Sequence, residues 1–198
     1  MSELEQLDTD LFFWINSHHH HVADWILWVA SQPWSWAIVL LLAFALTTLR
    51  REPRRWWLVL AGIGLCFLLS DRISVLCFKD VFCRLRPCQT LADVRMFRTS
   101  CGGLYGFVSS HAANVFALAT FLSLRFRTKG THSWLFALLI FLWAALVCYS
   151  RPYLGKHYPG DVICGAALGL CVGTVVFFVI QGIEHLTTKY HHQKKLAQ

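Results

Sequence analysis

Residues 150–161 read SRPYLGKHYPGD and lie between two apolar runs, Ser133 to Tyr149 and Val162 to Ile180. Charged groups close to hydrocarbon are costly, so cations, a histidine and a carboxylate gathered where such runs end indicate a function. His157 and Asp161 stand four residues apart at the start of the second run, and on a helix they would share one face. The carboxylate can then hold the imidazole in one tautomer and leave its other ring nitrogen free as a nucleophile.

Two further polar clusters interrupt the apolar sequence in the same way. Residues 79–87 read KDVFCRLRP and residues 108–111 read VSSH. Phosphoryl transfer needs cations and hydrogen-bond donors around the phosphate oxygens, and arginine binds phosphate bidentately while lysine supplies a point charge. Taken alone, Lys79 and Arg86 are read more simply as cations that meet lipid head groups, and Ser109 as the N-cap of a helix. The three clusters together favour a phosphate site.

Composition indicates one polytopic membrane domain. Of the 198 residues, 56% are hydrophobic and 15% are charged, with a mean hydropathy of +0.49, and about 20 apolar residues suffice for one membrane helix. Further apolar segments cover Trp25 to Thr48, Trp56 to Phe78 and Ala112 to Leu124. The first is broken at residues 31–33, so it is either one kinked span or a surface helix followed by a short span. We expect an all-α membrane bundle of five spans, or six if the N-terminal part also crosses.

Basic residues are distributed unevenly along the chain. The net charge of +7 would suit nucleic-acid binding in a soluble protein, but here the cations lie between apolar segments, so we expect no nucleic-acid partner. The positive-inside rule places three basic groups in the cytoplasm. Alternating spans then put the three polar clusters on the other side, which predicts an inner (plasma) membrane protein whose site faces the periplasm or exterior. The three groups are Arg50, Arg51, Arg54 and Arg55; Arg125, Arg127 and Lys129; and Lys189, Lys194 and Lys195.

The N-terminal residues carry a short amphipathic stretch. Leu7, Leu11, Phe12 and Ile15 would share one face of a helix, which fits a helix lying in the membrane interface and fits a packed terminal helix as well. We therefore divide the chain into an interfacial segment (residues 1–22), an integral membrane domain (residues 23–185) and a basic cytoplasmic tail (residues 186–198).

The loop between residues 79 and 109 holds residues whose roles the sequence leaves open. Cys83, Cys88 and Cys101 would face an oxidising compartment, so we expect one disulfide among them without choosing the pair. Asp71 and Arg72, inside a predicted span, are either supports for the site or a structural polar network. Five more residues are either head-group contacts or solvated loop residues: Arg84, Arg95, Arg98, Tyr105 and Lys156.

The order and spacing of the three clusters resemble the type-2 phosphatidic acid phosphatase superfamily. The matching pattern is Lys, six residues and Arg-Pro; Ser-x-His; and Ser-Arg, five residues, His, three residues and Asp. The family segment usually reads Pro-Ser-Gly-His, whereas Val108 and Ser110 replace its proline and glycine here. The resemblance implies a membrane lipid phosphatase that hydrolyses a phosphate monoester or a pyrophosphate on a lipid, with catalytic motifs at the extracytoplasmic face.

The resemblance also implies a role for each motif residue. His157 would attack phosphorus and become a phosphohistidine, Asp161 would orient it, and His111 would protonate the leaving oxygen and later activate water. The phosphate would be bound by Lys79, Arg86, Ser109, Ser110 and Arg151. No metal and no cofactor are implied, and cations around both histidines would repel a divalent ion.

The expected partners are membrane lipids and a phosphorylated lipid substrate. Candidate substrates are undecaprenyl diphosphate, phosphatidylglycerol phosphate, phosphatidate and lipid A, and the oligomeric state is not indicated. A lipid phosphotransferase could use the same site with an alcohol as acceptor. A non-catalytic lipid carrier would keep the cations but would not need the two histidines together with Asp161.

Overall fold

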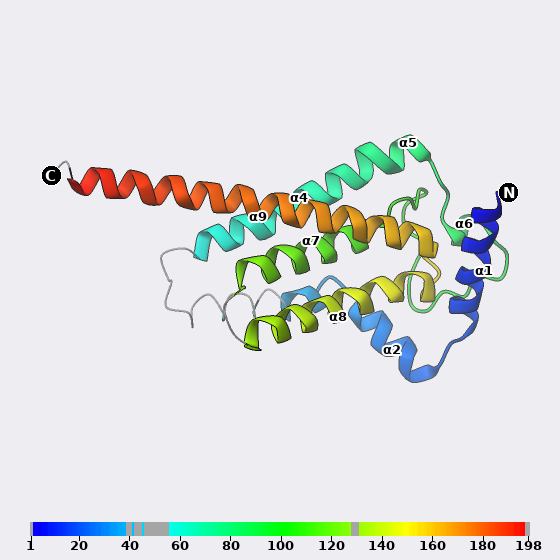
Figure 1. Cartoon of the computed structure of the whole chain (residues 1–198). Coiled ribbons are helices and arrows are strands. Elements are labelled where there is room, and N and C mark those ends of the chain that lie inside the picture. Colours follow the sequence, from blue (N-terminus) through cyan, green and yellow to red (C-terminus); the bar gives the residue numbers. More distant parts are fainter. Residues whose placement is uncertain (1, 39–40, 42–44, 46–55, 128–130, 197–198) are drawn as a thin grey trace.

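Helices make up the described chain apart from short connections and one long loop (Figure 1). The computed structural model describes residues 2–38, 41, 45, 56–127 and 131–196. The prediction of an all-helical chain is confirmed. The helices are α1 (Glu3–Ser17), α2 (His21–Ala30), α4 (Trp56–Ile73) with a π-helical turn (Ser74–Lys79) and α5 (Asp80–Phe82) continuing it, α6 (Pro87–Thr90), α7 (Ser110–Arg125), α8 (Thr131–Tyr153) and α9 (Pro159–Leu196).

Three helical stretches of the described residues are long and apolar enough to cross a membrane, namely Trp56–Phe82, Ser133–Tyr153 and Pro159–Lys189. They correspond to three of the predicted spans. The predicted span at Ala112 to Leu124 forms the shorter α7. Residues 39–40, 42–44 and 46–48 of the predicted segment at Trp25 to Thr48 lie outside the described residues, as do the basic group at residues 50–55 and Lys129. The total of five or six spans stays a prediction.

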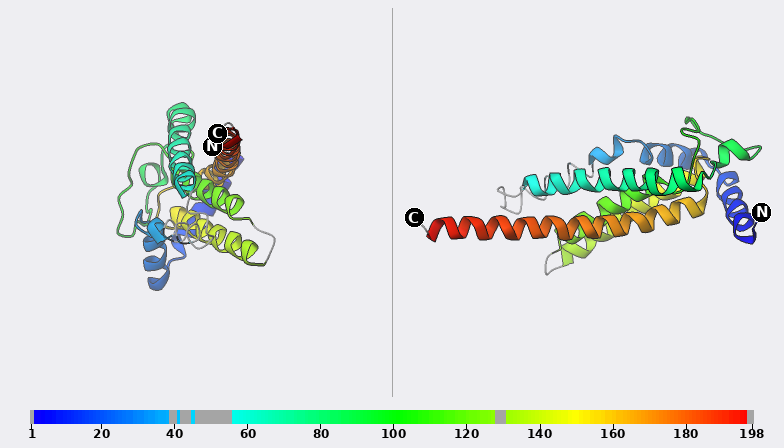
Figure 2. Two further views of the ribbon diagram at one scale, coloured as in Figure 1. Left: turned by 90° about the vertical axis from the view of Figure 1, so that its left-hand side faces the viewer. Right: turned by 90° about the horizontal axis from the view of Figure 1, so that it is seen from above.

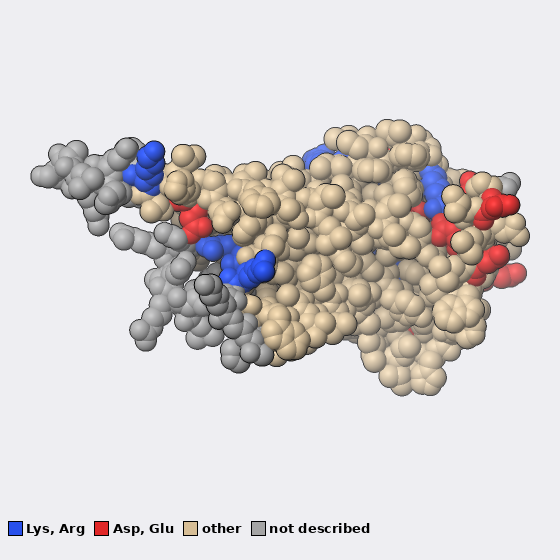
Figure 3. Space-filling model, in the orientation of Figure 1, with Lys and Arg blue, Asp and Glu red and all other residues tan. Residues whose placement is uncertain are grey.

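Most of the charged side chains on one face of the molecule lie toward its two ends. On the face drawn in Figure 3, Lys, Arg, Asp and Glu gather at both ends and most of the surface between them carries other residues. The long helices α4, α7, α8 and α9 run along the axis that joins these ends, whereas α1 lies across it (Figure 2). An elongated bundle with an apolar girdle is the arrangement expected for helices that must keep charges out of hydrocarbon.

The central helix α7 packs against α4, α8 and α9. Its Ala113, Ala117 and Phe121 side chains are fully buried. Three glycines spaced four residues apart, Gly165, Gly169 and Gly173, let α9 approach α7 very closely, since a Cβ atom at these positions would stand 2.5, 2.4 and 2.4 Å from backbone oxygens of α7 or its N-cap. Small residues at this spacing are a common device for close helix contact in membranes.

The end of the bundle that holds the N-terminus is closed by α1, α2 and the loop before α7 (Figure 1). Arg95 forms an ion pair with Asp24 of α2 at 2.6 Å, and Cys88 is bonded to Cys101. The prediction of one disulfide in this loop is therefore confirmed. Of the three cysteines considered there, Cys83 is the one outside the disulfide. These links hold in place the loop that follows the polar cluster at residues 79–87.

Candidate active site

His157 and Asp161 lie at the junction of α8 and α9, where both side chains are almost completely buried. Asp161 is in the first turn of α9, and its Oδ2 accepts a hydrogen bond from the backbone N–H of Tyr158 at 3.0 Å. A carboxylate that reaches back to the start of its own helix stabilises that helix end. The same oxygen lies 3.5 Å from Nδ1 of His157, somewhat longer than the usual range for a hydrogen bond. His157 precedes α9, which begins at Pro159, so the two residues do not share a helical face as predicted. The turn before α9 nevertheless brings the two side chains together.

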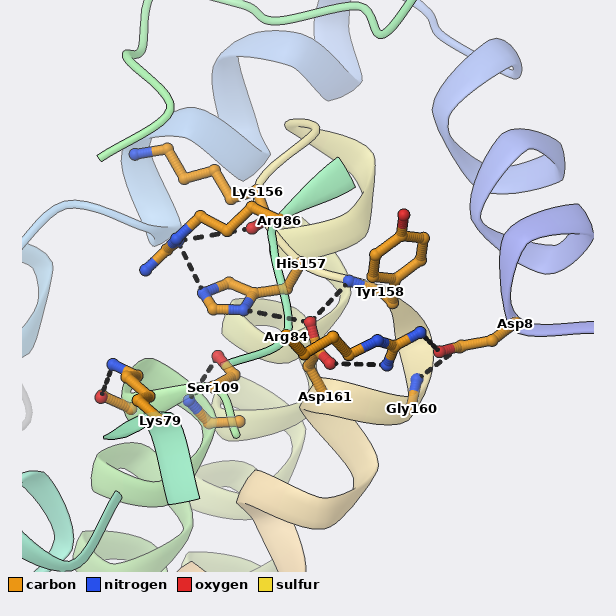
Figure 4. A network of polar contacts seen from close by, with 12 residues as sticks. Asp8, Lys79, Arg84, Arg86, Ser109, Lys156, His157, Tyr158, Gly160 and Asp161 are labelled. Atoms are coloured by element: carbon orange, nitrogen blue, oxygen red, sulfur yellow. Dashed lines mark hydrogen bonds and ion pairs between the residues drawn. The ribbon is translucent and has the colours of Figure 1, made fainter. Parts of the chain in front are cut away.

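Arg86 fixes the tautomer of His157. Its Nη1 lies 3.0 Å from Nε2 of His157 (Figure 4). A guanidinium can only donate, so Nε2 must accept with its lone pair, and the proton of a neutral ring then sits on Nδ1, toward Asp161. Burial and the charges of Arg86, Arg151 and Lys79 hold the pKa of His157 well below its usual range. His157 is therefore a neutral imidazole whose Nε2 lone pair faces a cation.

Among the described residues, the arginines closest to His157 have no carboxylate partner. Arg151 is 2% exposed, and the buried Nε atoms of Arg86 and Arg151 have no hydrogen-bond partner within the described ranges. In the described part of the chain, no carboxylate lies within ion-pair distance of either arginine. Burial and the charges of Arg151 and Arg86 also lower the pKa of Lys156 to about 8. Buried charges without partners are unfavourable unless an anion compensates them.

The π-helical turn brings Lys79 to the start of α7. Residues five apart in an α-helix point about 140° away from each other, whereas the wider π turn brings such residues toward one face. Ser74 and Lys79 begin and end this turn, and both contact the hydroxyl of Ser110, at 2.7 and 2.5 Å. The serine that replaces the usual family glycine therefore holds the Lys79 ammonium.

Ser109 and His111 approach the site from the N-terminal end of α7. Ser109 caps this helix, and its backbone N–H donates to the carbonyl of Asp161 at 2.9 Å, which ties α7 to α9. His111 stands one residue inside the helix, edge-on to the ring of Trp36 with ring centroids 5.9 Å apart. Arg151 is near enough for its charge to act on His111. All eight predicted site residues thus gather at one end of the bundle.

Several residues at the site were not identified from sequence. Gly106 lies over it, since a Cβ atom there would stand 3.1 Å from Oδ2 of Asp161. Asp8 of α1 reaches the site through Arg84, whose guanidinium contacts both Asp8 and Asp161 (Figure 4). The spacing of the α9 glycines was the sequence signal that could have revealed the α7 contact. No sequence pattern pointed to Asp8.

The structure also shows the surroundings of the residues for which the sequence left two possible roles. Arg84 and Arg95 are paired with carboxylates of the protein, and Arg98 lies over the rings of Trp25 and Trp28 at 4.9 and 5.4 Å. These three arginines therefore have structural partners. Lys156 sits beside Arg86, whose Nη1 donates to the Lys156 carbonyl at 3.4 Å. The side chains of Asp71 and Arg72 are exposed on α4, and Tyr105 pairs through its backbone with Leu85.

Comparison with known proteins identifies the family. Residues 64–184 match the family model of the PAP2 superfamily. The chain belongs to the PAP2 superfamily. It is 33% identical over 183 residues to the lipid A 4′-phosphatase of Porphyromonas gingivalis, which covers 90% of this chain and 75% of that protein. It is 33% identical over 189 residues to the lipid A 4′-phosphatase of Bacteroides thetaiotaomicron, covering 89% and 78%.

The PAP2 fold is also shown by a solved structure. The transmembrane PAP2-type phosphatidylglycerolphosphate phosphatase of Bacillus subtilis superposes with a TM-score of 0.67, at 20% identity, over 93% of this chain and 88% of that one. The family predicted from the three polar clusters is therefore confirmed. This PAP2 protein is a membrane lipid phosphatase.

Proposed function

We propose that this PAP2 enzyme hydrolyses a phosphate monoester on a lipid through a phosphohistidine formed at His157, without a metal ion. The observation that carries the proposal is the neutral His157 ring beside buried cations that have no carboxylate partner among the residues that the structure describes. A phosphate group placed among Lys79, Arg86 and Arg151 would supply the missing negative charge. The hydroxyl of Ser110 and the backbone N–H groups at the start of α7 would add hydrogen bonds, because a helix N-terminus favours anions.

In the first step, the Nε2 lone pair of His157 attacks phosphorus and the bond from phosphorus to the lipid oxygen breaks. His111, which takes up a proton once the phosphate dianion offsets the cations around it, gives that proton to the leaving oxygen and becomes a neutral ring. The imidazole becomes positively charged as the P–N bond forms, and Asp161 at Nδ1 stabilises that charge. The fixed cations meet the charge on the equatorial oxygens, which is the main requirement of phosphoryl transfer.

In the second step, His111 takes a proton from water, and the resulting hydroxide attacks phosphorus as the P–N bond breaks. Inorganic phosphate leaves and His157 returns to the neutral ring. One positioned side chain can thus serve as the acid in the first step and as the base in the second. The lipid phosphotransferase remains the alternative, since an alcohol in place of water would accept the same phosphoryl group. A non-catalytic lipid carrier is disfavoured, because the Arg86 contact keeps Nε2 of His157 unprotonated. A protein that only binds and carries a lipid would not need an unprotonated Nε2.

Lipid A is the substrate that we favour among the candidates. Its support is the similarity to two lipid A 4′-phosphatases along about nine-tenths of this chain. We further propose that the protein lies in the inner membrane with the site at the periplasmic face. The support is the separation of the site from the basic residues of α7 and α9, since Arg125 and Lys189 lie at the other ends of helices that begin at the site.

The proposal is tested by phosphate release from a lipid panel with EDTA present. The panel holds lipid A, phosphatidylglycerol phosphate, phosphatidate and undecaprenyl diphosphate, and the proteins are the wild type and His157→Ala. We expect lipid A to be hydrolysed fastest by the wild type and no lipid to be hydrolysed by the variant. Faster release from another lipid would exclude lipid A as the preferred substrate, and activity in the variant would exclude the nucleophile.

A further inference from the structure

Asp8, in the N-terminal helix, is linked to the His157–Asp161 pair through one arginine (Figure 4). Nη1 of Arg84 donates to Oδ1 of Asp161 at 2.8 Å, and Nη2 donates to Oδ2 of Asp8 at 2.7 Å. The side chains of Asp8 and Asp161 are 14% and 0% exposed, and that of Arg84 is 28% exposed. The guanidinium also lies over the ring of Tyr158, 4.2 Å from its centroid. Arg84 is therefore held between two carboxylates and is turned away from the phosphate position.

The sign of the charge behind His157 depends on Asp8. Arg84 alone would neutralise Asp161 and weaken its ability to stabilise a positive imidazole. With Asp8 included, the three groups carry two negative charges and one positive charge, so a net negative charge remains on the Nδ1 side of His157. Charges act strongly over such short distances where water is scarce. Without the Asp8 charge, this group would be neutral. It would then stabilise less well the positive charge that develops on His157 as the P–N bond forms.

Asp8 also holds the helix that carries Asp161. Its Oδ1 accepts a hydrogen bond from the backbone N–H of Gly160 at 2.7 Å, in the first turn of α9. A carboxylate at this end of a helix is favourable. The approach needs a glycine, because a Cβ atom at Gly160 would stand 2.8 Å from Oδ2 of Asp8. One carboxylate therefore fixes both the partner of Asp161 and the turn on which Asp161 is built.

Other contacts hold α1 in place without Asp8. Phe12 is fully buried, and its ring lies 5.7 Å from that of Tyr158. The amide of Asn16 donates to the carbonyls of Tyr153 and Arg95 at 2.9 and 3.0 Å, and it accepts from the backbone N–H of Arg95 at 2.9 Å. An uncharged residue at position 8 would leave α1 docked. The charge of Asp8 can thus be tested separately from the fold.

We propose that Asp8 is a positioning residue of the phosphatase site, which acts through Arg84 to keep Asp161 oriented and net negative behind His157. This inference rests on the proposed function of His157. It makes α1 a part of the active site. It also assigns Arg84 to the support of Asp161 and not to the phosphate.

The test compares Asp8→Asn, Asp8→Glu and Asp10→Asn in the full chain, with p-nitrophenyl phosphate as substrate and thermal unfolding measured for each. Asp10 is the matched control, because it is an exposed acid on the same helix. We expect Asp8→Asn to lower kcat by about tenfold or more, the effect typical of outer partners that orient a reacting group, with KM unchanged. Asp8→Glu keeps the charge and should retain more of kcat than Asp8→Asn. Asp10→Asn should match the wild type.

Wild-type kcat in Asp8→Asn would overturn the inference. A raised KM with unchanged kcat in Asp8→Asn would also overturn it, because Asp8 would then be a substrate-binding group. An equal loss of kcat in Asp8→Glu and Asp8→Asn, together with a lowered melting temperature, would make the role of Asp8 structural. His157→Ala in the same assay tests the proposed function separately. If that variant turns over normally, the mechanism fails whatever Asp8 does.

Discussion

Gly165 of α9 lies against the carbonyl oxygen of Ser109 at the start of α7, so closely that a Cβ atom at Gly165 would stand 2.5 Å from that oxygen. This contact sets the distance between two polar clusters that are far apart in the sequence. His111 follows Ser109 on α7, and Asp161 precedes Gly165 by one turn on α9. The close approach of the two helices therefore brings the predicted acid to the predicted nucleophile.

Gly165→Ala should lower both stability and activity, because the added methyl group forces α7 and α9 apart. Overpacking of this kind costs about 1–3 kcal/mol, and a small displacement of His111 relative to His157 slows turnover. Gly182→Ala is the control on the same helix, since a Cβ atom there would meet nothing within 4 Å. Melting temperature in detergent and kcat measure the two effects. Equal behaviour of the two variants would show that the α7–α9 contact does not set the site geometry.

Ser110→Gly should weaken the binding of phosphate analogues, although it restores the residue usual in the family. The hydroxyl of Ser110 is the group that joins Lys79 to Ser74, and a hydrogen bond to a charged group contributes about 1.5–3 kcal/mol. We expect the inhibition constant for vanadate to rise by roughly tenfold or more, with a smaller rise in Ser74→Ala. Ser123→Ala is the control, because its buried hydroxyl has no partner. Unchanged vanadate inhibition in Ser110→Gly would remove Ser110 from the phosphate site.

Activity should persist in excess EDTA and fall with vanadate. Lys79, Arg86 and Arg151 supply the positive charge that a metal would otherwise bring, and vanadate adopts the trigonal bipyramidal geometry of the transition state. Analogues of the transition state bind more tightly than substrates, so we expect inhibition at roughly micromolar to millimolar concentrations. Phosphate release from the purified enzyme measures both. Loss of activity in EDTA with recovery on adding zinc or magnesium would make the histidines metal ligands.

A cysteine at position 92 should be labelled from outside intact cells, and one at position 189 only after lysis. Ala92 and Lys189 are both exposed, and they lie near opposite ends of the bundle. The measurement uses Ala92→Cys and Lys189→Cys, each in a background without the six free cysteines and with Cys88–Cys101 retained. The opposite labelling pattern would place the site in the cytoplasm.

Much of the site could be predicted from sequence because its chemistry depends on residues with fixed local spacing. His157 and Asp161 are only four residues apart in the chain, and the positions of Lys79 and Arg86 follow from one short segment. The disulfide was predicted from the compartment expected for its loop, but the Cys88–Cys101 pairing depends on how that loop folds. Local spacing cannot give such a pairing.

The parts that escaped prediction depend on contacts between distant segments. Asp8 is about 150 residues from Asp161 in the chain, and its role exists only because Phe12 and Asn16 dock α1 onto the loops at the site. The four apolar residues predicted to share one face of the N-terminal helix also differ in burial. Phe12 and Ile15 are buried, while Leu7 and Leu11 are 64% and 42% exposed. One helix thus has a face toward the protein and a neighbouring apolar face left outside.

The most direct test of the central claim is to trap the phosphoenzyme in His111→Ala with p-nitrophenyl phosphate. This substrate has a leaving group that needs little protonation, so the first step can proceed without His111 while the second step, which needs His111 to activate water, is slow. We expect a burst of one p-nitrophenolate per enzyme and an acid-labile, base-stable phosphate on the peptide that contains His157, absent in the His111→Ala/His157→Ala double variant. No burst, or phosphate on another residue, would contradict the phosphohistidine mechanism.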